Sequence, residues 1–425
     1  MSLTGALNSA VSALRSQSTA LSIISDNIAN SGTTAYKGNE GRFRELVTQQ
    51  MTSTRYSAGG VSVYANTSIR QQGIIEESSS ATDIAVDGSG FFPVTKTANG
   101  KPVYWTRDGR FTIDESGYLT NNGWVLQGWP VDADGTVTAA NRNNTASLEA
   151  IDVNRYSTTA AASTTLDFDA NLPANAAVGD AFTTSTEVYD SLGTAHNIEI
   201  TWTKTADNTW QAVFGDPTLG SDATTATGTV TSGAVDIVFN GDGTLASTNP
   251  DPVELTITGW STGADDSTIA VNLGTVGSAN GLSQYSQNDT TDLYVDVDSI
   301  DQDGIAYGRR TSVEITESGL VVAKFDNGHT VPIYKIPLAT FASPEGLDEV
   351  TGGIYADTVY SGNYTLQDAG TGAAGLVRGG ALEASTVDTA EEFSRMIVCQ
   401  QAYSSASQII STADEMYDSL LSAVR

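Results

Sequence analysis

Residues 3–29 read LTGALNSAVSALRSQSTALSIISDNIA. In this stretch apolar side chains recur every three or four residues, at Leu3, Leu7, Ala10, Leu14, Leu21, Ile24 and Ile28, and Gln17 is the one polar member of the series. This spacing is typical of a helix that pairs with a second helix along one apolar seam. It predicts a helix over residues 3–29, about 40 Å long at 1.5 Å per residue.

A second series with the same spacing lies at the other end of the chain. Its members are Met396, Cys399, Tyr403, Ala406, Ile410, Ala413, Tyr417, Leu420 and Val424. The preceding residues 389–392, TAEE, have the form of a capping box, in which the Thr389 side chain accepts a hydrogen bond from the third helical amide. We therefore expect a helix from 389 to the chain end, and we expect the two terminal helices to pair as a coiled coil.

Both apolar series are almost free of charge. Arg15 is the only charged residue between Met1 and Ser25, and none occurs between Met396 and Ala413. A coiled coil in water carries Lys and Glu on its outer faces, whereas small neutral side chains can be covered by other chains without burying an unpaired charge. The pattern favours helices covered on every side inside a larger assembly over a solvated coiled-coil stalk. Too many polar residues interrupt both stretches for membrane insertion.

Between the helices, the residue types and the period are those of β-structure. Thr, Val, Ile, Tyr and Trp recur between closely spaced Gly turns, and residues 156–308 contain a single basic residue, Lys204. The predicted fold class is mainly β with α-helical termini and nested antiparallel β-domains. The predicted segments are paired terminal helices (1–30 and 389–425), linker segments (31–70 and 366–388), a β-domain (71–155 and 300–365) and an inserted outer β-domain (156–299).

The composition limits the partners and the compartment. The net charge of -30 and the isoelectric point near 4.1 would repel nucleic acid and anionic membranes. Cys399 is the single cysteine, so no internal disulfide is possible, and its place on the seam predicts a buried, inert thiol. The N-terminus shows no basic leader with a cleavage site, yet scarce Lys with abundant Gly, Ser, Thr and Asp is typical of extracellular proteins.

The predicted linker 31–70 is locally basic. It contains Lys37, Arg42, Arg44, Arg55 and Arg70 against Glu40 and Glu45. In so acidic a chain this segment is suited to lie against an acidic surface of a neighbouring subunit. A solvated loop is equally compatible with the pattern.

Candidate catalytic groups are few. His196 and His329 fall in different predicted domains, each beside a predicted hairpin turn, and we expect surface side chains without a general-base role. Residues 88–90, GSG, are followed by a strand pattern, whereas a phosphate-binding loop requires a helix there. No catalytic residue, cofactor or metal ligand is predicted.

The acidic run at residues 296–304, DVDSIDQDG, has the residue types of a calcium site. Its spacing does not match a loop with ligands at positions one, three and five, and no Glu follows at the twelfth position. We expect a solvated acidic turn. A calcium-binding extracellular adhesin is retained as an alternative function.

Residues 23–37, IISDNIANSGTTAYK, resemble the N-terminal signature of the bacterial flagellar rod and hook family, with Ala35 where Gly is usual. Residues 81–92, 104–111, 379–388 and 409–416 resemble further blocks of this family. The signature residues of this chain are Asn27, Ala29, Asn30, Thr34, Tyr36 and Lys37. The inserted domain and residues 187–193 and 341–347 are similar to hook rather than rod members. The last helix departs from the family at Gln401, Ala406 and Gln408, which remove charge.

The resemblance implies a structural subunit, not an enzyme, that self-assembles into a curved, flexible tube acting as a universal joint between rod and filament. It further implies an extracellular location, export through the flagellar type III apparatus without a cleaved signal peptide, and contacts with the distal rod protein, the hook-filament junction protein and the hook cap. A distal rod protein of the same family is a second alternative.

Overall fold

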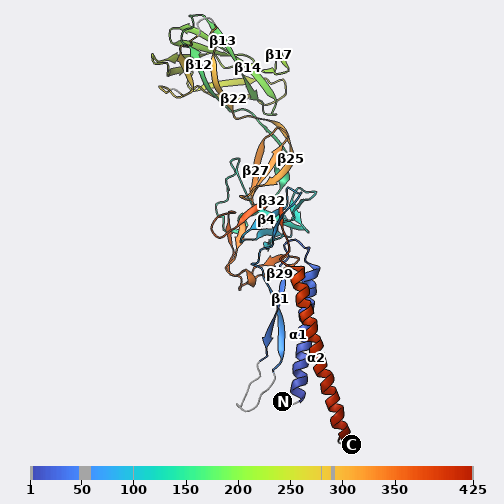
Figure 1. Ribbon diagram of the computed structural model, residues 1–425. Coiled ribbons are helices and arrows are strands. Elements are labelled where there is room, and N and C mark those ends of the chain that lie inside the picture. The colour runs from blue at the N-terminus through green and yellow to red at the C-terminus, as the bar shows by residue number, and fades with distance from the viewer. Residues whose placement is uncertain (1–2, 47–58, 99, 279, 289–291, 424–425) are drawn as a thin grey trace. The chain divides into compact units, whose positions relative to one another are not determined.

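The computed structural model describes residues 3–46, 59–98, 100–278, 280–288 and 292–423. It is mainly β with two terminal helices that contact each other, which confirms the predicted fold class (Figure 1). The chain divides into a unit that we call the terminal unit, composed of Met1–Arg155, Val313–Ala323 and Val331–Arg425. The second, which we call the inserted unit, is composed of Tyr156–Ser312 and Lys324–Thr330.

The terminal helices α1 (Leu3–Ala29) and α2 (Thr389–Ala423) run antiparallel, so that both chain ends lie at the same end of the pair (Figure 1). Small side chains are buried on both helices, Ala10 and Ala20 on α1 and Ala406 and Ala413 on α2. Helix α2 has 35 residues and α1 has 27. In consequence α2 continues past the beginning of α1, and no described residue of α1 lies beside its last turns (Figure 1).

The cap of α2 differs from the predicted capping box. Asp388, not Thr389, supplies the capping oxygen: its Oδ1 accepts hydrogen bonds from the backbone N–H of Ala390 at 2.8 Å and of Glu391 at 3.2 Å. A carboxylate satisfies two orphan donors and also carries the charge that the positive helix end favours. Glu392, the last residue of the capping-box pattern, is bound to Arg395.

The predicted linker after α1 contains an antiparallel hairpin, β1 (Asn39–Glu45) with β2 (Val61–Thr67), paired from Asn39 with Thr67 to Glu45 with Val61. The hairpin lies along α1 (Figure 1). The Ser16 hydroxyl donates to the Val61 carbonyl at 3.0 Å, and the Val61 N–H donates to the Ser12 hydroxyl at 3.2 Å. Small polar side chains on α1 thus let a strand approach the helix closely.

The β-structure of the terminal unit combines strands from both halves of the chain. β4 pairs with β32 and β3 with β33, while the main sheet has the order β27-β9-β5-β6-β30-β29. Its core contains Trp105 and Trp129, with the rings of Phe91 and Tyr355 in edge contact at 5.9 Å. The remaining bounds are β3 (Ile75–Glu77), β4 (Ile84–Asp87), β5 (Phe92–Thr95), β6 (Tyr104–Thr106), β7 (Thr112–Ile113), β8 (Leu119–Asn121), β9 (Trp124–Pro130), η1 (Thr145–Ser147), β10 (Glu149–Ala150), β28 (Leu338–Thr340), η3 (Pro344–Gly346), β29 (Asp348–Thr351), β30 (Ile354–Ala356), β31 (Thr365–Gln367), β32 (Leu376–Gly379) and β33 (Ala381–Glu383).

Three strands and one short helix carry the chain between the two units. They are η2 (Val153–Tyr156), β25 (Ile305–Ile315), β26 (Leu320–Phe325) and β27 (Thr330–Lys335).

The inserted unit consists of two sheets around one apolar core. One sheet has the order β18-β21-β22-β12-β23 with β24 beside β12, and the other has the order β17-β16-β14-β15-β19-β20 with β13 beside β14. Trp202 and Trp210 are fully buried between them. The bounds are β11 (Thr158–Ala161), β12 (Thr165–Pro173), β13 (Ala181–Tyr189), β14 (Ala195–Ala206), β15 (Thr209–Phe214), β16 (Thr218–Leu219), β17 (Asp222–Ala226), β18 (Thr229–Val230), β19 (Val235–Phe239), β20 (Leu245–Asn249), β21 (Val253–Thr258), β22 (Ser267–Asn272), β23 (Leu282–Tyr285) and β24 (Asp296–Gln302).

Two details of this unit differ from expectation. β12 pairs in parallel with β22 and β23, because these strands return to it after long connections rather than through tight turns. The acidic run expected to be a turn is largely strand β24, paired antiparallel with β12. Only its end is a turn, where Asp303 accepts hydrogen bonds from the N–H groups of Thr164 and Thr165 at 2.7 and 2.9 Å.

His196, expected at the surface, is fully buried in the inserted unit. Its Nδ1 lies 2.7 Å from the Thr227 hydroxyl, and its Nε2 lies 3.2 Å from Asp190 Oδ2, which also accepts a hydrogen bond from Thr262 at 2.7 Å. The ring centroid lies 4.3 Å from that of Trp260. Burial of these polar groups is tolerated because each has a partner. His329 is half-buried in its predicted hairpin.

We predict that His196→Ala destabilises the protein by about 3 kcal/mol, because it leaves the buried carboxylate of Asp190 without its imidazole partner. His329→Ala is the matched control and should change the free energy of unfolding by less than about 0.5 kcal/mol. Denaturant unfolding of the full chain, followed by tryptophan fluorescence, measures both. Equal effects of the two substitutions would contradict the structural role of His196.

The same network predicts a pH dependence. Burial raises the pKa of Asp190, but hydrogen bonds from Thr262, Thr194, His196 and Leu192 outweigh burial and hold its pKa below the ordinary value of 3.8. The resulting stabilisation is therefore present above that ordinary value and is lost as the pH falls through the folded-state pKa. We expect the difference in melting temperature between wild type and Asp190→Asn to shrink as the pH falls from 7 to below about 4. A constant difference over this range would refute the expectation.

Candidate functional site

The predicted seam residues lie on both terminal helices. Ile24 is buried, and six others are half-buried in the single chain: Leu7, Leu14, Leu21, Ile28, Met396 and Ile410. Tyr403 and Tyr417 keep 43% and 37% of their surface exposed. Leu3 and Leu420 belong to α1 and α2, and Val424 lies outside the described residues. The seam is thus closed at Ala406 and Ala413 and partly open at Tyr403 and Tyr417.

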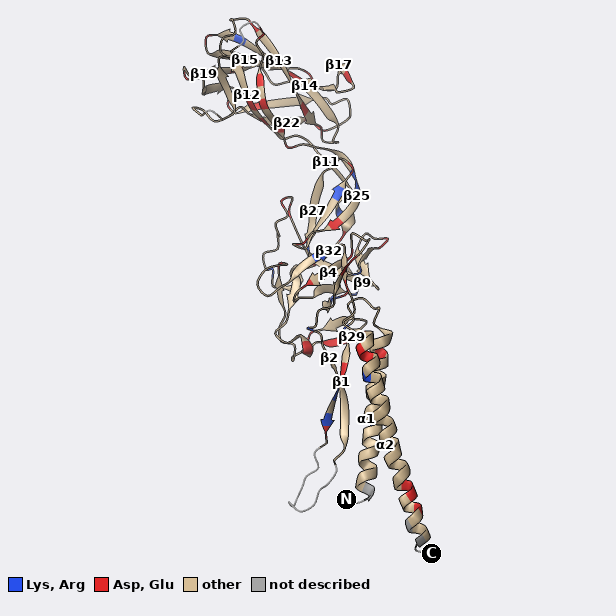
Figure 2. Cartoon of the chain, viewed as in Figure 1, with Lys and Arg blue, Asp and Glu red and all other residues tan. Residues whose placement is uncertain are grey.

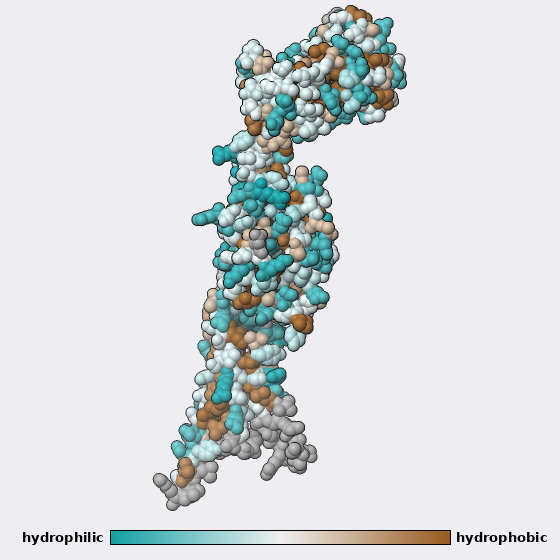
Figure 3. All heavy atoms as spheres, turned by 180° about the vertical axis from the view of Figure 1, so that it is seen from behind, coloured by the Kyte–Doolittle hydropathy of each residue, from teal (hydrophilic) through white to brown (hydrophobic). Residues whose placement is uncertain are grey.

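Helix α2 also exposes apolar side chains outside the seam, which the sequence reasoning missed. Advancing 100° per residue places Val398, Ile409 and Met416 on one flank of the seam and Phe393 and Ile397 on the other. All five are between 48% and 64% exposed. Apolar patches occur along the helical part of the terminal unit (Figure 3). A helix that is apolar on several sides is built to be covered on several sides.

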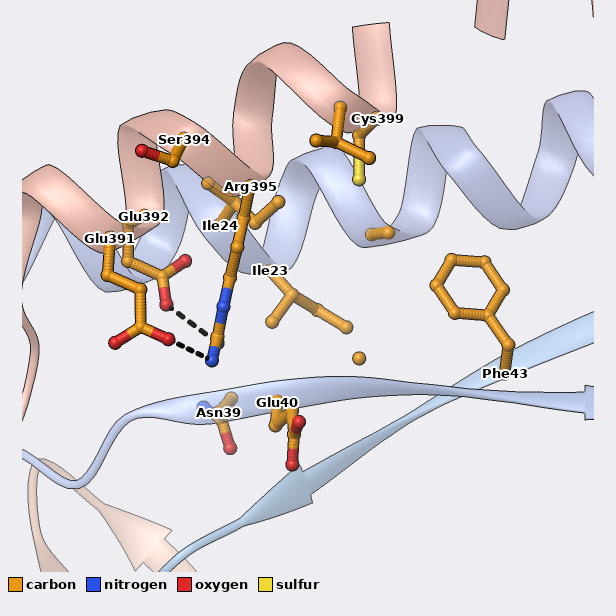
Figure 4. Close-up of a pocket in the computed structure, with 13 residues that line it drawn as sticks. Ile23, Ile24, Asn39, Glu40, Phe43, Glu391, Glu392, Ser394, Arg395 and Cys399 are labelled. Carbon is orange, nitrogen blue, oxygen red and sulfur yellow. Dashed lines mark hydrogen bonds and ion pairs between the residues drawn. The ribbon is translucent and has the colours of Figure 1, made fainter. Parts of the chain in front are cut away.

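An apolar pocket of about 360 Å³ lies between α1, α2 and β1. Figure 4 shows Ile23 and Ile24 on its α1 side, Cys399 on its α2 side and Phe43 on its β1 side. At one edge, an ion cluster joins Arg395 to Glu391 at 2.7 Å and to Glu392 at 3.1 Å.

The thiol of Cys399, predicted to be buried, is half-buried in this pocket. Burial and the charge of Glu392 raise its pKa, which keeps it protonated and unreactive near neutral pH.

Several signature residues hold the end of α1 against the start of β1. Asn27 is 2% exposed; its Nδ2 donates to the Asn39 carbonyl at 2.8 Å, and its Oδ1 accepts from the Asn39 N–H at 2.9 Å. The Tyr36 hydroxyl donates to the same Oδ1 at 3.3 Å. One amide side chain thus fixes the direction in which the chain leaves the helix.

The turn after α1 explains a residue preference of the signature. Ala35 has a φ of 55°, in the left-handed region that favours glycine, and its N–H donates to the Glu383 carbonyl at 2.7 Å. Asn30 binds the Asp26 carbonyl through its side chain at 2.9 Å, and the Thr34 hydroxyl accepts from Arg110 at 2.6 Å. Ala29, the last residue of α1, is exposed.

A buried ion cluster joins the two ends of the chain. The carboxylate of Glu383, with no exposed surface, binds Lys37 through Oε1 and Arg107 through Oε2, the latter at 3.3 Å. Oε1 also accepts from the Gly73 N–H at 2.7 Å, and Lys37 donates to the Gln71 carbonyl at 2.7 Å. Burial lowers the pKa of Lys37, against the opposing effect of Glu383.

Backbone bonds reinforce this junction between the chain ends. The Thr386 N–H donates to the Tyr36 carbonyl at 3.1 Å, and the Gly38 N–H donates to the Thr386 hydroxyl at 3.0 Å. Residues 35–38, which follow α1, and residues 383–386, which precede α2, are therefore held together. The sequence showed Lys37 as a signature residue but gave no sign of its partner 346 positions away.

Across residues 3–423, leaving out those that the structure does not describe, no three His, Cys, Asp or Glu side chains are placed to hold a metal ion. Neither described helix combines the length and the apolar character that crossing a membrane requires.

Four family models match the chain in order. They are described as flagella basal body rod protein (residues 7–37), flagellar hook protein FlgE/F/G D1 domain (85–165), flagellar basal body protein FlaE D2 domain (159–305) and flagellar basal body rod FlgEFG protein C-terminal (378–423). They cover the α1 signature, parts of both units and α2.

Relatives and a solved structure agree with these matches. The flagellar hook protein FlgE of Rhizobium meliloti is 34% identical over the whole of both chains, and that of Escherichia coli K12 is 31% identical over 98% of this chain and 99% of its own. The crystal structure of Helicobacter pylori flagellar hook protein FlgE2 superposes with a TM-score of 0.52 over 73% of this chain and all of its own, at 14% identity, and so shares the fold. The chain belongs to the flagellar hook protein FlgE family.

Proposed function

We propose that this chain is a structural subunit that polymerises into the flagellar hook by covering the exposed flanks of its terminal helices with the helices of neighbouring copies. The observation that carries this proposal is helix α2, which has no charged residue from Met396 to Ala413 and on which Phe393, Ile397, Val398 and Ile409 are about half-exposed. Burying an apolar side chain contributes roughly 1.5–3 kcal/mol, so a few such contacts per subunit suffice for assembly.

The role proposed is mechanical and not catalytic. The buried His196 has a structural explanation in its bonds to Asp190 and Thr227, and the raised pKa of Cys399 disfavours a nucleophilic thiolate. Contacts with the distal rod protein, the junction protein and the hook cap, and export by the flagellar type III apparatus without a cleaved signal peptide, are part of this proposal. The family membership and the Lys-poor composition support it.

The proposal predicts that Ile410→Pro abolishes polymerisation while the β-structure stays folded, because proline breaks the interior of α2 at a cost of roughly 3 kcal/mol. Electron microscopy of the purified chain and circular dichroism measure the two outcomes. Ser407→Ala, at an exposed position of the same helix, is the control and should assemble normally. Tubes of normal length from the proline variant would refute the role of α2.

The junction leads to a separate prediction. Glu383→Gln leaves Lys37 and Arg107 buried without a counter-charge and should destabilise the terminal unit by about 3–5 kcal/mol. The control is Glu317→Gln, which removes an exposed ion pair with Arg378 and should cost less than about 1 kcal/mol. Thermal melts of the full chain compare them, and similar melting temperatures for the two variants would argue against the buried cluster.

A further inference from the structure

The β1–β2 hairpin presents a basic face away from the apolar pocket. Phe43 lines the pocket, and since side chains alternate along a strand, Arg42 and Arg44 lie on the opposite face. Tyr64 stands opposite Arg42 in the register and is 49% exposed. Figure 2 shows the basic end of β1. We call Arg42, Arg44 and Tyr64 the hairpin outer face.

Ion pairing within the chain leaves the arginines of the hairpin outer face exposed. Arg42 is 3.4 Å from Glu40, with both side chains about half-exposed, a geometry that contributes little to stability. Arg44 is exposed. The chain has 20 basic and 50 acidic residues, so two neighbouring outward guanidinium groups make this strand end locally basic.

The end of α2 has the complementary chemistry. Asp414, Glu415 and Asp418 are exposed there, beside Met416 and Leu421, which are 56% and 67% exposed. No basic residue occurs between Arg395 and Arg425. We call residues 414–422 the acidic end of α2; the acidic residues there colour the ribbon red in Figure 2. This is the part of α2 that continues past α1 (Figure 1).

We propose that the hairpin outer face of one copy binds the acidic end of α2 of a neighbouring copy. Arg42 and Arg44 would pair with the carboxylates of Asp414 and Asp418, which lie one helical turn apart, while Tyr64 covers Leu421 on the same face of α2. Among the described residues no ion pair links these two surfaces within the chain. The inference rests on the proposed function, because it requires the polymer.

The arrangement of the two surfaces suits an open polymer. They are different patches of the same chain, so each copy offers one to the next and receives the other, and such heterologous contacts generate rings or helical filaments rather than closed dimers. Charged groups at the contact set register and suppress wrong pairings, which apolar flanks alone do poorly. The hairpin and the end of α2 would then fix the position that the apolar flanks stabilise.

Charge reversal with rescue tests the contact. Arg42→Glu/Arg44→Glu and Asp414→Lys/Asp418→Lys should each raise the concentration needed for tube formation by about tenfold at low salt, and the fourfold variant that combines them should return to within about threefold of wild type. The control Lys96→Glu/Lys101→Glu, at exposed positions away from both surfaces, should assemble as wild type does. Sedimentation and electron microscopy quantify the tubes.

The outcomes separate the inference from the proposed function. If wild type forms no tubes, the proposed function fails. If wild type forms tubes and the double variants assemble equally well, or the fourfold variant is no better than the double variants, the inference is overturned while the proposed function stands.

A disulfide probe tests proximity without relying on charge. In a Cys399→Ser background, Tyr64→Cys/Leu421→Cys tubes exposed to a mild oxidant should yield a ladder of covalent multimers, since a disulfide requires Cα atoms within about 7 Å. Each single cysteine variant can form dimers at most. Absence of the ladder from assembled tubes, or closure within one chain at unchanged monomer mass, would overturn the proposal.

Discussion

The buried carboxylate of Glu383 is the constraint on which the terminal unit depends. It joins three segments that are far apart in the sequence, through Lys37 after α1, Arg107 in the sheet and the Gly73 amide. A buried carboxylate without these partners would be costly, so the three segments must come together before the charge can be buried. The ion cluster around Glu383 therefore holds the start of α2 close to the end of α1, and this proximity lets the two helices pair.

The helix pair is stable enough to form in one chain but leaves apolar surface uncovered. Ala406 and Ala413 close the seam against α1, whereas Ile397 and Ile409 stand outside it. An isolated chain can cover only one side of α2, because a single helix accompanies it. In the proposed polymer, neighbouring copies supply the other sides, which accounts for a helical stretch without charge from Met396 to Ala413 in a chain of net charge -30.

Sequence periodicity predicted the mainly β fold with terminal helices, because a seam repeated over 27 residues has few other structural solutions. It did not locate the ion cluster, since nothing in the spacing of Lys37 and Glu383 indicates that they meet. The burial of His196 was predictable in principle. Side chains alternate between the two faces of β14, and this alternation puts His196 on the same face as Ile198 and Ile200. The hairpin turn beside it favoured a surface position in our interpretation, and the tertiary partners Asp190 and Thr227 decided otherwise.

A polymer of this chain must assemble against its own charge. At physiological ionic strength the screening length is about 8 Å, so the repulsion between copies acts mainly where surfaces touch. The two proposed contacts, at the flanks of α2 and between the hairpin outer face and the acidic end of α2, avoid this repulsion in different ways. The flanks of α2 carry no charge from Met396 to Ala413, so nothing there repels. Where charge does occur, at the end of α2, the hairpin offers Arg42 and Arg44, and the like charges of the remaining surface then disfavour every other pairing of copies.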